Sequence, residues 1–513
     1  MSLWSILERA RRLHPDRPAV GDDGHALSYA SLGARVDALA HRLVELGQRP
    51  GDRVAALLPN GPAYLEGYFA AAGAGLILVP LNTRLTASEL GFILRDSGST
   101  LLLADPALAP LAHAAMAEAP EVGHVVWAGS TPEWSGRASG VAWPEPGGPP
   151  FVPVVTSMDQ VAQLYYTSGT TGPPKGVMLT HRNVWVHALA AIAELELRET
   201  DVWGHIAPMF HLADAWATFA ITWVGGRHLM VPQFEPGEVL ATLERESVTI
   251  TNLVPTMLNL MVKHPTATER RFPRLRRILS GGAPIAPAVV EAIVNIFKCE
   301  YVQTYGMTET SPYLTLSLLK HHLRALPPAE RLRYQAKTGR PFIAIELRVV
   351  DDAGVPVAAD ERAVGEIQVR GETVTPGYWK RPDATAAAFT TDGWLRTGDL
   401  AVLDSEGYVS IVDRKKDMII TGGEKVYSTE VEAVLYQHPA VLEAAVFGSP
   451  DAIWGEVVNA AVVLRDGARL TAEEITDFCR PQLAGFKLPR HVRFLTELPK
   501  TGSGKILKRA LAG

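Results

Sequence analysis

Hydrophobic and polar positions along the chain alternate between two kinds of pattern. Residues 27–47 carry apolar side chains at helical spacing and end on glycine, whereas the run DRVAALLP that follows is short and apolar. The same change recurs at LILVPLN, LLLAD, HVVWAG and RHLMVP. Because strands that alternate with helices build layered sheets, the pattern predicts an α/β fold.

The pattern changes near Gly365. Short apolar runs separated by tight turns, GEIQVRG, GWLRTGDLAVLD and GYVSIVDR, predict strands of a smaller β-rich unit. After the charged break DRKKD, strand and helix patterns alternate for roughly 100 residues, the size of a small domain. We therefore expect a large multi-layer α/β domain over residues 1–412 and a small, mobile α+β domain over residues 413–513.

Two further segments have a clear pattern. The longest apolar run, Tyr68–Pro80, contains glycine and proline and is too short to span a bilayer, so it predicts a buried helix followed by a strand. The segment Ser135–Pro153 is rich in proline and glycine, which predicts a loop between lobes.

Composition narrows the class of protein. The 513 residues require at least two domains, and 47% hydrophobic with 20% charged residues is typical of a folded globular chain. A formal net charge of −6 gives no basic surface for nucleic acid or an anionic membrane. Only Cys299 and Cys479 occur, and the charged N-terminus lacks an apolar signal core, so we expect a reducing cytoplasm.

The densest chemical signal is YTSGTTGPPKG, from Tyr166 to Gly176. Its glycines let backbone N–H groups point into a concavity, and its hydroxyls and Lys175 add donors that suit phosphate oxygens. An apolar stretch precedes it and a helix-like stretch follows, so it connects two elements. A surface turn is the alternative, since Gly/Ser/Thr clusters usually are turns, and the run does not match the GxxxxGK[ST] phosphate loop. Composition alone leaves both interpretations open.

The order of motifs along the chain decides between them. YTSGTTGPPKG is followed by SGGAP, QTYGMTET, GWLRTGDLA, DRKKDMIITGGEKVYSTEVE and PKTGSGK. This series resembles the adenylate-forming superfamily, which includes acyl-CoA synthetases, luciferases and the adenylation domains of peptide synthetases. Six motifs in one order leave little room for chance, and the resemblance is strongest to the acyl-CoA synthetases.

The resemblance implies an ATP site. Glu309 would hold Mg²⁺, a hard cation that prefers carboxylate and phosphate oxygens, although a lone glutamate is usually a solvated surface group. Thr308 would donate to the α-phosphate, and Asp399 and Arg414 would contact the ribose. The phosphate loop would comprise Thr167, Ser168, Gly169, Thr170, Thr171, Gly172 and Lys175, and the adenine pocket Gly282, Ala283, Pro284, Tyr305 and Gly306.

Lys505 is the main catalytic candidate that the resemblance implies. The acid's carboxylate and the α-phosphate of ATP are both anions, and a lysine between them would offset their repulsion in the transition state. Taken alone, a lysine near a C-terminus is usually a solubility residue. The small domain would then rotate about Asp413, so that Gly422, Gly423 and Lys425 line a tunnel for the pantetheine of coenzyme A.

The acid would bind near PMFHLADAW. His211 matches the family's orienting group between the acyl pocket and the thiol tunnel, and the pocket would further include Asp214, Trp216, Gly281 and Met307. Trp216 would shorten the pocket if it points inward, which favours a short, medium-chain or aryl acid, but it fits the core of a helix equally well. Asp214 is the only candidate for grasping a substrate amino group.

The sequence therefore predicts an ATP-dependent carboxylic acid–CoA ligase that uses Mg²⁺ and coenzyme A. An adenylate passed to an amine or to a carrier-protein thiol, and a non-catalytic nucleotide sensor, are the alternatives. Oligomeric state, with a homodimer among the open assemblies, and acetylation of Lys505 are left undecided. Two departures from the family pattern, Ser428 in place of proline and Gln303 in place of asparagine, lie at supporting positions.

Overall fold

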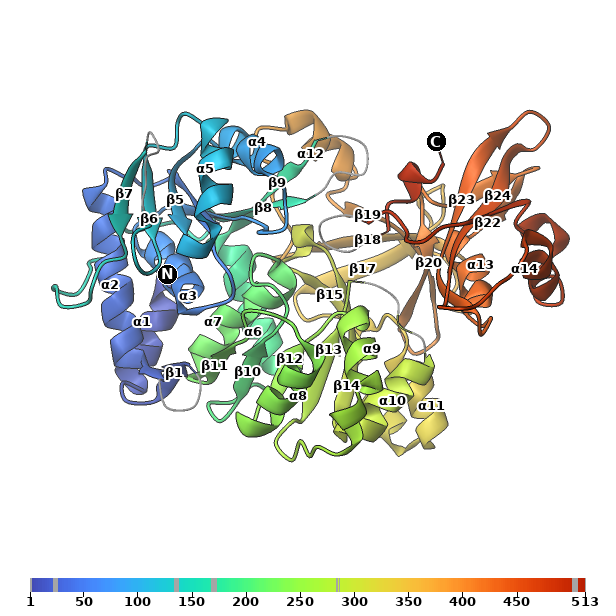
Figure 1. The fold of residues 1–513 in the computed structure, drawn as a ribbon, viewed down its shortest axis with the longest axis horizontal. Coiled ribbons are helices and arrows are strands. Elements are labelled where there is room, and N and C mark those ends of the chain that lie inside the picture. Colours follow the sequence, from blue (N-terminus) through green and yellow to red (C-terminus); the bar gives the residue numbers. More distant parts are fainter. Residues whose placement is uncertain are drawn as a thin grey trace. The chain divides into compact units, whose positions relative to one another are not determined.

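The computed structural model describes residues 2–21, 26–132, 138–167, 173–282, 285, 287–500 and 506–512. The chain forms two compact units (Figure 1). The first comprises residues 1–346 and 369–395, and the second comprises residues 347–368 and 396–513. Among the described residues, no helix is long and apolar enough to cross a membrane.

The first unit contains a seven-stranded sheet in the order β7-β6-β5-β3-β4-β8-β9. Its strands run parallel, except that the last one returns antiparallel to its neighbour. In chain order they are β3 (Arg53–Leu57), β4 (Ile77–Pro80), β5 (Ser99–Ala104), β6 (His124–Trp127), β7 (Ser139–Ala142), β8 (Val161–Thr167) and β9 (Lys175–Thr180).

A second sheet of nine strands completes the first unit, in the order β16-β15-β14-β13-β12-β10-β11-β1-β2. Its central strands, from β14 to β1, are parallel neighbours. The strands are β1 (Pro18–Val20), β2 (Leu27–Ser28), β10 (Val202–His205), β11 (Arg227–Met230), β12 (Ile250–Asn252), β13 (Arg277–Ser280), β14 (Glu300–Gly306), β15 (Tyr313–Leu316) and β16 (Arg340–Pro341).

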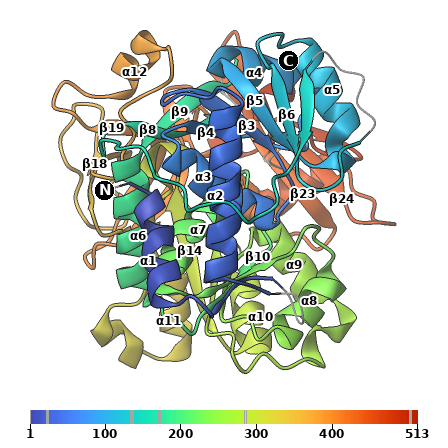
Figure 2. The same cartoon turned by 90° about the vertical axis from the view of Figure 1, so that its left-hand side faces the viewer.

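Helices cover both faces of both sheets. One core joins residues of the two sheets with a shared layer of helices: α1 (Trp4–Leu13), α2 (Tyr29–Glu45), α3 (Pro62–Gly73), α6 (His181–Leu195) and α7 (Leu212–Val224). Figure 2 shows α1 and α2 of this layer side by side. The outer face of the first sheet carries α4 (Ala87–Ser97) and α5 (Ala109–Ala117), and that of the second carries α8 (Pro236–Arg245), α9 (Pro255–Lys263) and α10 (Pro287–Phe297). Two shorter helices follow, α11 (Pro328–Gln335) and α12 (Pro382–Ala388).

Alternation along the strands produces this layering. In β13, Leu279 belongs to the shared core while its neighbour Ile278 packs with the outer helices. In β14, Val302 and Tyr301 divide in the same way. Because successive side chains of a strand point to opposite faces, a strand buried on both faces must be apolar throughout. The near-continuous apolar runs in the sequence follow from this requirement.

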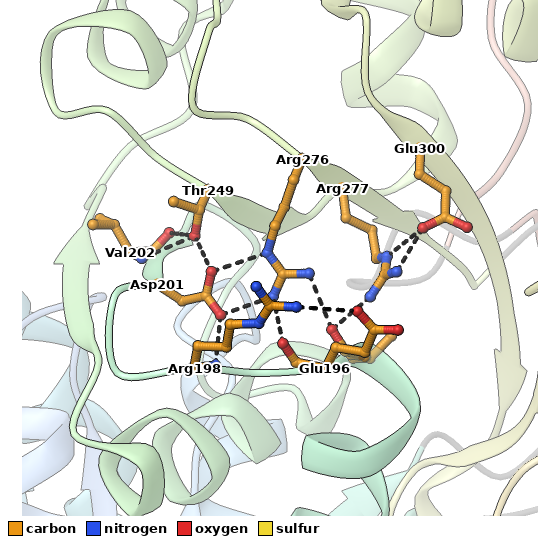
Figure 3. A network of polar contacts seen from close by, with 9 residues as sticks. Glu196, Arg198, Asp201, Val202, Thr249, Arg276, Arg277 and Glu300 are labelled. Carbon is orange, nitrogen blue, oxygen red and sulfur yellow. Dashed lines mark hydrogen bonds and ion pairs between the residues drawn. The ribbon is translucent and has the colours of Figure 1, made fainter.

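Ion pairs join the amino ends of the parallel strands in the second sheet (Figure 3). Asp201, just before β10, accepts from the Arg276 guanidinium at 3.0 and 2.7 Å and from the Thr249 hydroxyl at 2.8 Å. Arg277 in β13 donates to Glu300 in β14 at 2.8 and 2.6 Å. Both arginines also donate to carbonyl groups at the end of α6, where a positive charge is favoured by the helix dipole.

The second unit carries two antiparallel-rich sheets. The four-stranded sheet has the order β17-β18-β19-β20 and the other the order β22-β21-β24-β23, with β25 beside β24. Helix α13 packs against β23 and α14 against β25. The elements are β17 (Ile345–Val350), β18 (Gly365–Gly371), β19 (Leu395–Leu403), β20 (Val409–Arg414), β21 (Ile419–Thr421), β22 (Glu424–Val426), α13 (Ser428–Leu435), β23 (Val441–Asp451), β24 (Gly455–Leu464), α14 (Ala472–Cys479) and β25 (His491–Phe494).

Most expectations drawn from the hydrophobic pattern are confirmed. The predicted helix at residues 27–47 is α2, and Tyr68–Pro80 forms the end of α3 followed by β4. Two predictions are wrong. Ser135–Pro153 contains β7, which pairs with β6 at the edge of the seven-stranded sheet, so the segment is not all loop. The stretch after Tyr166–Gly176 begins as strand β9, because it returns antiparallel to β8, and the helix starts only at His181.

Candidate active site

The predicted ligand-binding residues of the first unit gather at one edge of the nine-stranded sheet. Strands β10, β12, β13 and β14 are parallel neighbours, so their carboxyl ends share that edge. His211 and α7 follow β10, Gly281 and Gly282 follow β13, and Gly306 ends β14. In open α/β sheets, ligands bind beyond the carboxyl ends of the strands. The topology therefore brings together segments that lie some 100 residues apart in the sequence.

Glu309 lies at this edge in a short 3₁₀ turn, Thr308–Thr310. It is only 7% exposed, so it is not a solvated surface carboxylate. The Tyr378 hydroxyl donates a hydrogen bond to Glu309 Oε1 at 2.9 Å, and Lys175 Nζ lies 5.2 Å from the centre of the Tyr378 ring. We call Glu309, Tyr378 and Lys175 the carboxylate cluster.

The carboxylate cluster suits a phosphate group and its metal ion. Burial and the neighbouring Glu309 carboxylate raise the pKa of Tyr378, so the phenol stays protonated and donates to that carboxylate. A fixed carboxylate fits Mg²⁺, which takes one or two carboxylates together with substrate phosphate oxygens. Lys175 adds a positive charge beside them. The donor set thus fits a magnesium–nucleotide complex.

The chain leaves β13 and β14 through glycines that pack against backbone. A β-carbon at Gly306 would lie 1.9 Å from the Pro312 carbonyl oxygen, and one at Gly281 would lie 2.3 Å from Thr304 Oγ1. Gly282 has φ +86°, a conformation that L side chains rarely adopt. A side chain at Gly281 or Gly306 would collide with its neighbours and one at Gly282 would strain the backbone, so the fold favours glycine at all three positions. Tyr305, Met307 and Thr308 continue the same edge, and all three are half-buried.

Trp216 is buried in α7 and does not project into solvent. It is 1% exposed, and its ring packs edge-on against Trp203 at 5.0 Å and Tyr313 at 5.3 Å between centroids. His211 precedes the helix, with its ring edge-on to Phe210 at 4.7 Å. The sequence left an inward pocket wall and a helix core open for Trp216. The ring is packed in the core between α7 and Tyr313 of β15, and its role as a wall of the acyl pocket stays a prediction.

Asp214 is fully buried and already holds two donors. Its Oδ2 lies 2.5 Å from His205 Nδ1, and its Oδ1 accepts from Trp203 Nε1 at 3.2 Å. Both oxygens therefore bind protein groups, which removes the reason to read Asp214 as a partner for a substrate amino group. Its place in the acyl pocket stays a prediction.

In the second unit, the two predicted ribose contacts form a cross-strand pair. Asp399 in β19 lies opposite Arg414 in β20, and Arg414 Nε is 3.5 Å from Asp399 Oδ1. Asp399 is 9% exposed, whereas the Arg414 side chain is 45% exposed. The pairing positions a carboxylate and a guanidinium side by side, and their contact with ribose stays a prediction.

Asp413, the predicted hinge, is buried among hydrogen-bonded polar side chains, an arrangement that the sequence did not indicate. The Ser428 hydroxyl donates to its two carboxylate oxygens at 3.0 and 2.8 Å, and the Ser428 N–H donates as well. Lys508 Nζ contacts the Ser428 hydroxyl at 2.6 Å and Glu432 at 2.7 Å. Burial raises the pKa of Asp413. Ser428, noted in the sequence only as a departure from proline, thus supplies two donors that proline lacks.

The predicted coenzyme A residues lie in the β21–β22 hairpin, with Gly422 and Gly423 in its turn and Lys425 in β22. Gly422 and Gly423 have φ +59° and +86°. A β-carbon at Gly422 would lie 2.8 Å from the Trp454 ring, whereas one at Gly423 would meet nothing within 4 Å. Lys425 Nζ pairs with Asp352 at 3.1 Å. The role of these residues in a thiol tunnel stays a prediction.

Several predicted residues lie outside the described part of the chain: Ser168, Gly169, Thr170, Thr171, Gly172, Ala283, Pro284 and Lys505. Their neighbours are described. Thr167 and Lys175 lie opposite each other at the end of the β8–β9 hairpin. Lys500 and Ile506 form an antiparallel bridge.

The sequence missed Tyr378, which joins the carboxylate cluster from a segment with no motif of its own. Only the fold brings TPGYWK beside β9 and the turn after β14, through the Trp379 N–H bond to the Gly176 carbonyl. The two cysteines were interpreted as packing residues, and this is confirmed. Burial raises the pKa of Cys299 to about 12 and that of Cys479 to about 11, so both thiols stay protonated.

Comparison with known proteins agrees with this arrangement. The AMP-binding enzyme family matches residues 7–379, and its C-terminal domain matches residues 430–505. A feruloyl-CoA synthase from Amycolatopsis sp is 41% identical over 506 residues, covering 98% of this chain and 97% of the relative. A long-chain-fatty-acid–CoA ligase from Thermus thermophilus is 39% identical over 521 residues, covering 100% and 95%.

A solved structure extends the likeness to three dimensions. The o-succinylbenzoate CoA synthetase from Bacillus subtilis, in complex with its acyl-adenylate intermediate, superposes with a TM-score of 0.86 at 32% identity and covers 100% of this chain and 98% of that one. The expected large α/β domain followed by a smaller C-terminal domain is confirmed by these matches. The chain therefore belongs to the AMP-binding enzyme family, the adenylate-forming superfamily that its ordered motifs resemble.

Proposed function

We propose that this enzyme is an AMP-forming carboxylic acid–CoA ligase. The observation that carries the proposal is the carboxylate cluster at the carboxyl edge of the nine-stranded sheet, where Glu309, Tyr378 and Lys175 meet. The full-length relatives named as CoA ligases support coenzyme A as the acceptor. ATP, Mg²⁺ and coenzyme A are the small molecules that this reaction requires.

The first half-reaction joins two anions. A carboxylate oxygen of the acid attacks the α-phosphorus of ATP, the bond to the β-phosphate oxygen breaks, and acyl-AMP and pyrophosphate form. Two lysines are the cations that we assign to offset the repulsion between these anions. Lys175 acts at the outer phosphates and Lys505 at the α-phosphate. Glu309 holds the magnesium that neutralises the phosphate oxygens when nucleotide is bound. Thr308 donates to the α-phosphate, and His211 orients the acid.

The second half-reaction needs no protein nucleophile. The thiol sulfur of coenzyme A attacks the acyl carbon of the mixed anhydride, AMP leaves with the bonding electron pair, and the thiol proton passes to solvent. Cys299 and Cys479 are buried with raised pKa values, which fits an enzyme that takes its thiol from a substrate. Gly422 and Gly423 are the positions that we assign to the thiol's path.

The acid that we propose is a short-chain, medium-chain or aryl carboxylic acid. The buried ring of Trp216 lies beside Tyr313 and the first turn of α7, where it limits the depth of an acyl site. The relatives named for feruloyl, long-chain and 2-succinylbenzoate substrates cover both aryl and aliphatic acids. A bulky wall favours the more compact of these.

We propose further that residues 413–513 move as a domain about Asp413, so that Lys505 and the Gly422–Gly423 turn serve different half-reactions. Lys505→Ala is expected to lower acyl-AMP formation about 100- to 1,000-fold, on the scale of losing one transition-state charge donor. It should still convert supplied acyl-AMP to acyl-CoA. Gly423→Leu is expected to do the reverse, because the new side chain enters open space, and Gly423→Ala is its control.

Both half-reactions are measured separately, by ATP–pyrophosphate exchange and by thioester formation from synthetic acyl-AMP. If Lys505→Ala and Gly423→Leu lower both half-reactions equally, alternation of the small domain is the wrong account. That result would indicate that a single arrangement of the two domains serves both half-reactions.

The overall function is tested with a panel of short, medium-chain, long-chain and aryl acids. Each acid is incubated with ATP and Mg²⁺, with and without coenzyme A, and the products are read by mass spectrometry. A CoA-dependent thioester supports the proposal and identifies the acid. An acyl-AMP that coenzyme A does not convert transfers the proposal to an amine or carrier-protein acceptor, and no adenylate from any acid rejects it.

We place the enzyme in the cytoplasm, as two buried thiols without a disulfide fit a reducing compartment. The oligomeric state stays open, with a homodimer among the assemblies to be tested. Cell fractionation tests the location, and light scattering of the purified protein tests the oligomeric state.

A further inference from the structure

A chain of buried polar side chains runs behind the first turn of α7. Asp214 Oδ2 lies 2.5 Å from His205 Nδ1, His205 Nε2 lies 2.9 Å from His228 Nδ1, and His228 Nε2 lies 3.0 Å from the Thr222 hydroxyl. The Asp214, His205, His228 and Thr222 side chains are all fully buried. The two imidazole rings are stacked, with centroids 5.2 Å apart and planes at 18°. We call Thr222, His228, His205 and Asp214 the buried relay.

Each ring nitrogen of the buried relay has one partner, so the direction of donation is fixed. The Asp214 carboxylate only accepts, which assigns the Nδ1 proton of His205 to that bond. His205 Nε2 then accepts from His228 Nδ1–H, and His228 Nε2 accepts from the Thr222 hydroxyl. Burial and the neighbouring His205 lower the pKa of His228, in agreement with a neutral ring. A chain with one internally consistent set of donors holds its members in one arrangement.

The buried relay matters most for the rotation of α7. This helix is buried along nearly its whole surface, from Leu212 to Thr222. A helix that is apolar on all sides gains the same burial at several rotations about its axis, since the hydrophobic effect has no direction. Asp214 and Thr222 lie eight residues apart on one side of the helix, and they connect it to β10 and β11 through two histidines. These directional bonds select one rotation.

That rotation sets where Trp216 lies. Asp214 also accepts from Trp203 Nε1 at 3.2 Å, and the Trp203 ring packs edge-on against Trp216 at 5.0 Å between centroids. Trp216 Nε1 donates to the Ala213 carbonyl, which also accepts from Asn252 Nδ2 at 2.8 Å. The first turn of α7 is thereby attached to the carboxyl ends of β10 and β12, beside the residues that we assign to the acid.

We propose that the buried relay determines which acids the enzyme accepts, with His205, His228 and Asp214 acting as positioning residues for Trp216. This inference rests on the proposed function, because it concerns the acid of that same site. His205 and His228 touch no substrate in this account. They act by holding the first turn of α7, so that the wall of the acyl site does not move when a longer acid enters.

The test compares three variants. His228→Leu interrupts the buried relay at its centre, and Trp203→Phe keeps an aromatic side chain, smaller than the indole, but removes the donor to Asp214. Thr251→Val is the matched control, because Thr251 is an equally buried residue on the neighbouring strand whose hydroxyl donates to the Gly204 carbonyl at 2.8 Å outside the relay. For each, kcat and KM are measured by ATP–pyrophosphate exchange with a compact aryl acid and with a long-chain acid, together with the thermal midpoint.

We expect His228→Leu and Trp203→Phe to change the ratio of kcat/KM between the two acids at least tenfold, through KM for the acid, with KM for ATP unchanged. Thr251→Val should keep the ratio within twofold, even if its thermal midpoint falls as far as the midpoints of the other two variants. A ratio that stays constant in all three variants, or changes equally in all three, overturns the inference while acyl-AMP formation by the wild type upholds the proposed function. Should His228→Leu not fold, Trp203→Phe against Thr251→Val decides. Absence of any acyl-AMP from the wild type rejects the proposed function, and the inference with it.

Discussion

The two edges of the nine-stranded sheet are built from the same strands and differ in what they leave for a ligand. At the amino edge, Asp201, Arg276, Arg277 and Glu300 satisfy one another and the carbonyl groups at the end of α6 (Figure 3). At the carboxyl edge, Gly281 and Gly306 have no room for a side chain, and the Glu309 carboxylate accepts a hydrogen bond from the Tyr378 phenol.

The comparison shows how one sheet separates stability from chemistry. Charges at the amino edge are matched in pairs, so removing one member leaves its partner poorly solvated and weakens the fold. Charges at the carboxyl edge belong to the site that we assign to magnesium and nucleotide. A variant at the amino edge should therefore lower stability and leave activity per folded molecule intact, and a variant at the carboxyl edge should do the reverse. Three measurements test this division, and a fourth tests the buried core beside Trp216.

The largest effect is expected from Glu309→Gln. The amide keeps the shape and still accepts the Tyr378 hydrogen bond but lacks the charge that Mg²⁺ needs, so adenylation should fall about 100- to 1,000-fold. The thermal midpoint should stay close to that of the wild type. ATP–pyrophosphate exchange and scanning calorimetry measure the two quantities. A large loss of stability with activity retained per folded molecule would break the comparison.

The next effect concerns the amino edge. Asp201→Ala leaves the Arg276 guanidinium and the Thr249 hydroxyl without their acceptor, and the arginine is about one-third exposed, so water offsets part of the loss. We expect a cost of about 1–3 kcal/mol in the free energy of unfolding, with kcat per folded molecule unchanged. Urea titration followed by fluorescence measures it. Arg198→Ala, at a side chain that is 68% exposed, is the control and should change the free energy by under about 0.5 kcal/mol.

Tyr378→Phe sharpens the account of the carboxylate cluster. It removes one hydrogen bond to Glu309 and keeps the ring beneath Lys175. A hydrogen bond to a charged group is worth about 1.5 kcal/mol or more, so adenylation should fall about tenfold with KM for the acid unchanged. Titration of activity against Mg²⁺ should shift to higher concentration. An unchanged magnesium dependence would separate Tyr378 from the metal site.

The last effect is a pH dependence of stability in the core of the first unit. His187 packs between Tyr313 and Phe342 beside Trp216, and burial lowers its pKa to about 3. Below pH about 6.5 the unfolded chain binds a proton at this histidine and the folded chain does not, so the stability it contributes falls as pH drops, by up to about 1.4 kcal/mol per pH unit. His187→Phe should reduce the slope of the free energy of unfolding against pH, between pH 6 and 4.5, by the amount that corresponds to about one bound proton.

The difference between His187→Phe and the wild type is the quantity to use, because buried carboxyls contribute in the opposite direction. Burial raises the pKa values of Asp413 and Glu432, which are present in both proteins and cancel in the subtraction. Identical slopes for the two proteins would show that His187 is protonated in the folded state.

Much of this architecture could be predicted from the sequence, because local pattern determines it. Helix α2 follows from apolar spacing and begins at the Ser28 hydroxyl, which caps Ser31 N–H. Strand β9 was mistaken for the start of a helix, since its residues VML fit either period until β8 supplies the partner. Strand β7 was missed for a similar reason, as its pairing with β6 is not encoded in its own glycine-rich segment.

The site divides in the same way. Lys175, Glu309 and Asp399 lie in motifs that carry their own signal, so resemblance could find them. Tyr378 and His228 have no motif, and their importance comes from side chains that approach from other elements. Ser428 could be noted as unusual but not explained, because its two bonds to Asp413 exist only in the folded second unit. Long-range polar contacts are the part that a single sequence does not contain.

The pairing of β1 with β11 has a consequence for how the chain is made. Pro18–Val20 leaves the ribosome well before its parallel partner, Arg227–Met230, which is made about 200 residues later. Until that partner is synthesised, the N-terminal strand and the apolar face of α1 have no finished sheet to join, and chaperones meet them in this exposed form. The first unit, which extends to residue 395, is therefore expected to become resistant to proteolysis on the ribosome only after the strands beyond β11 are also made.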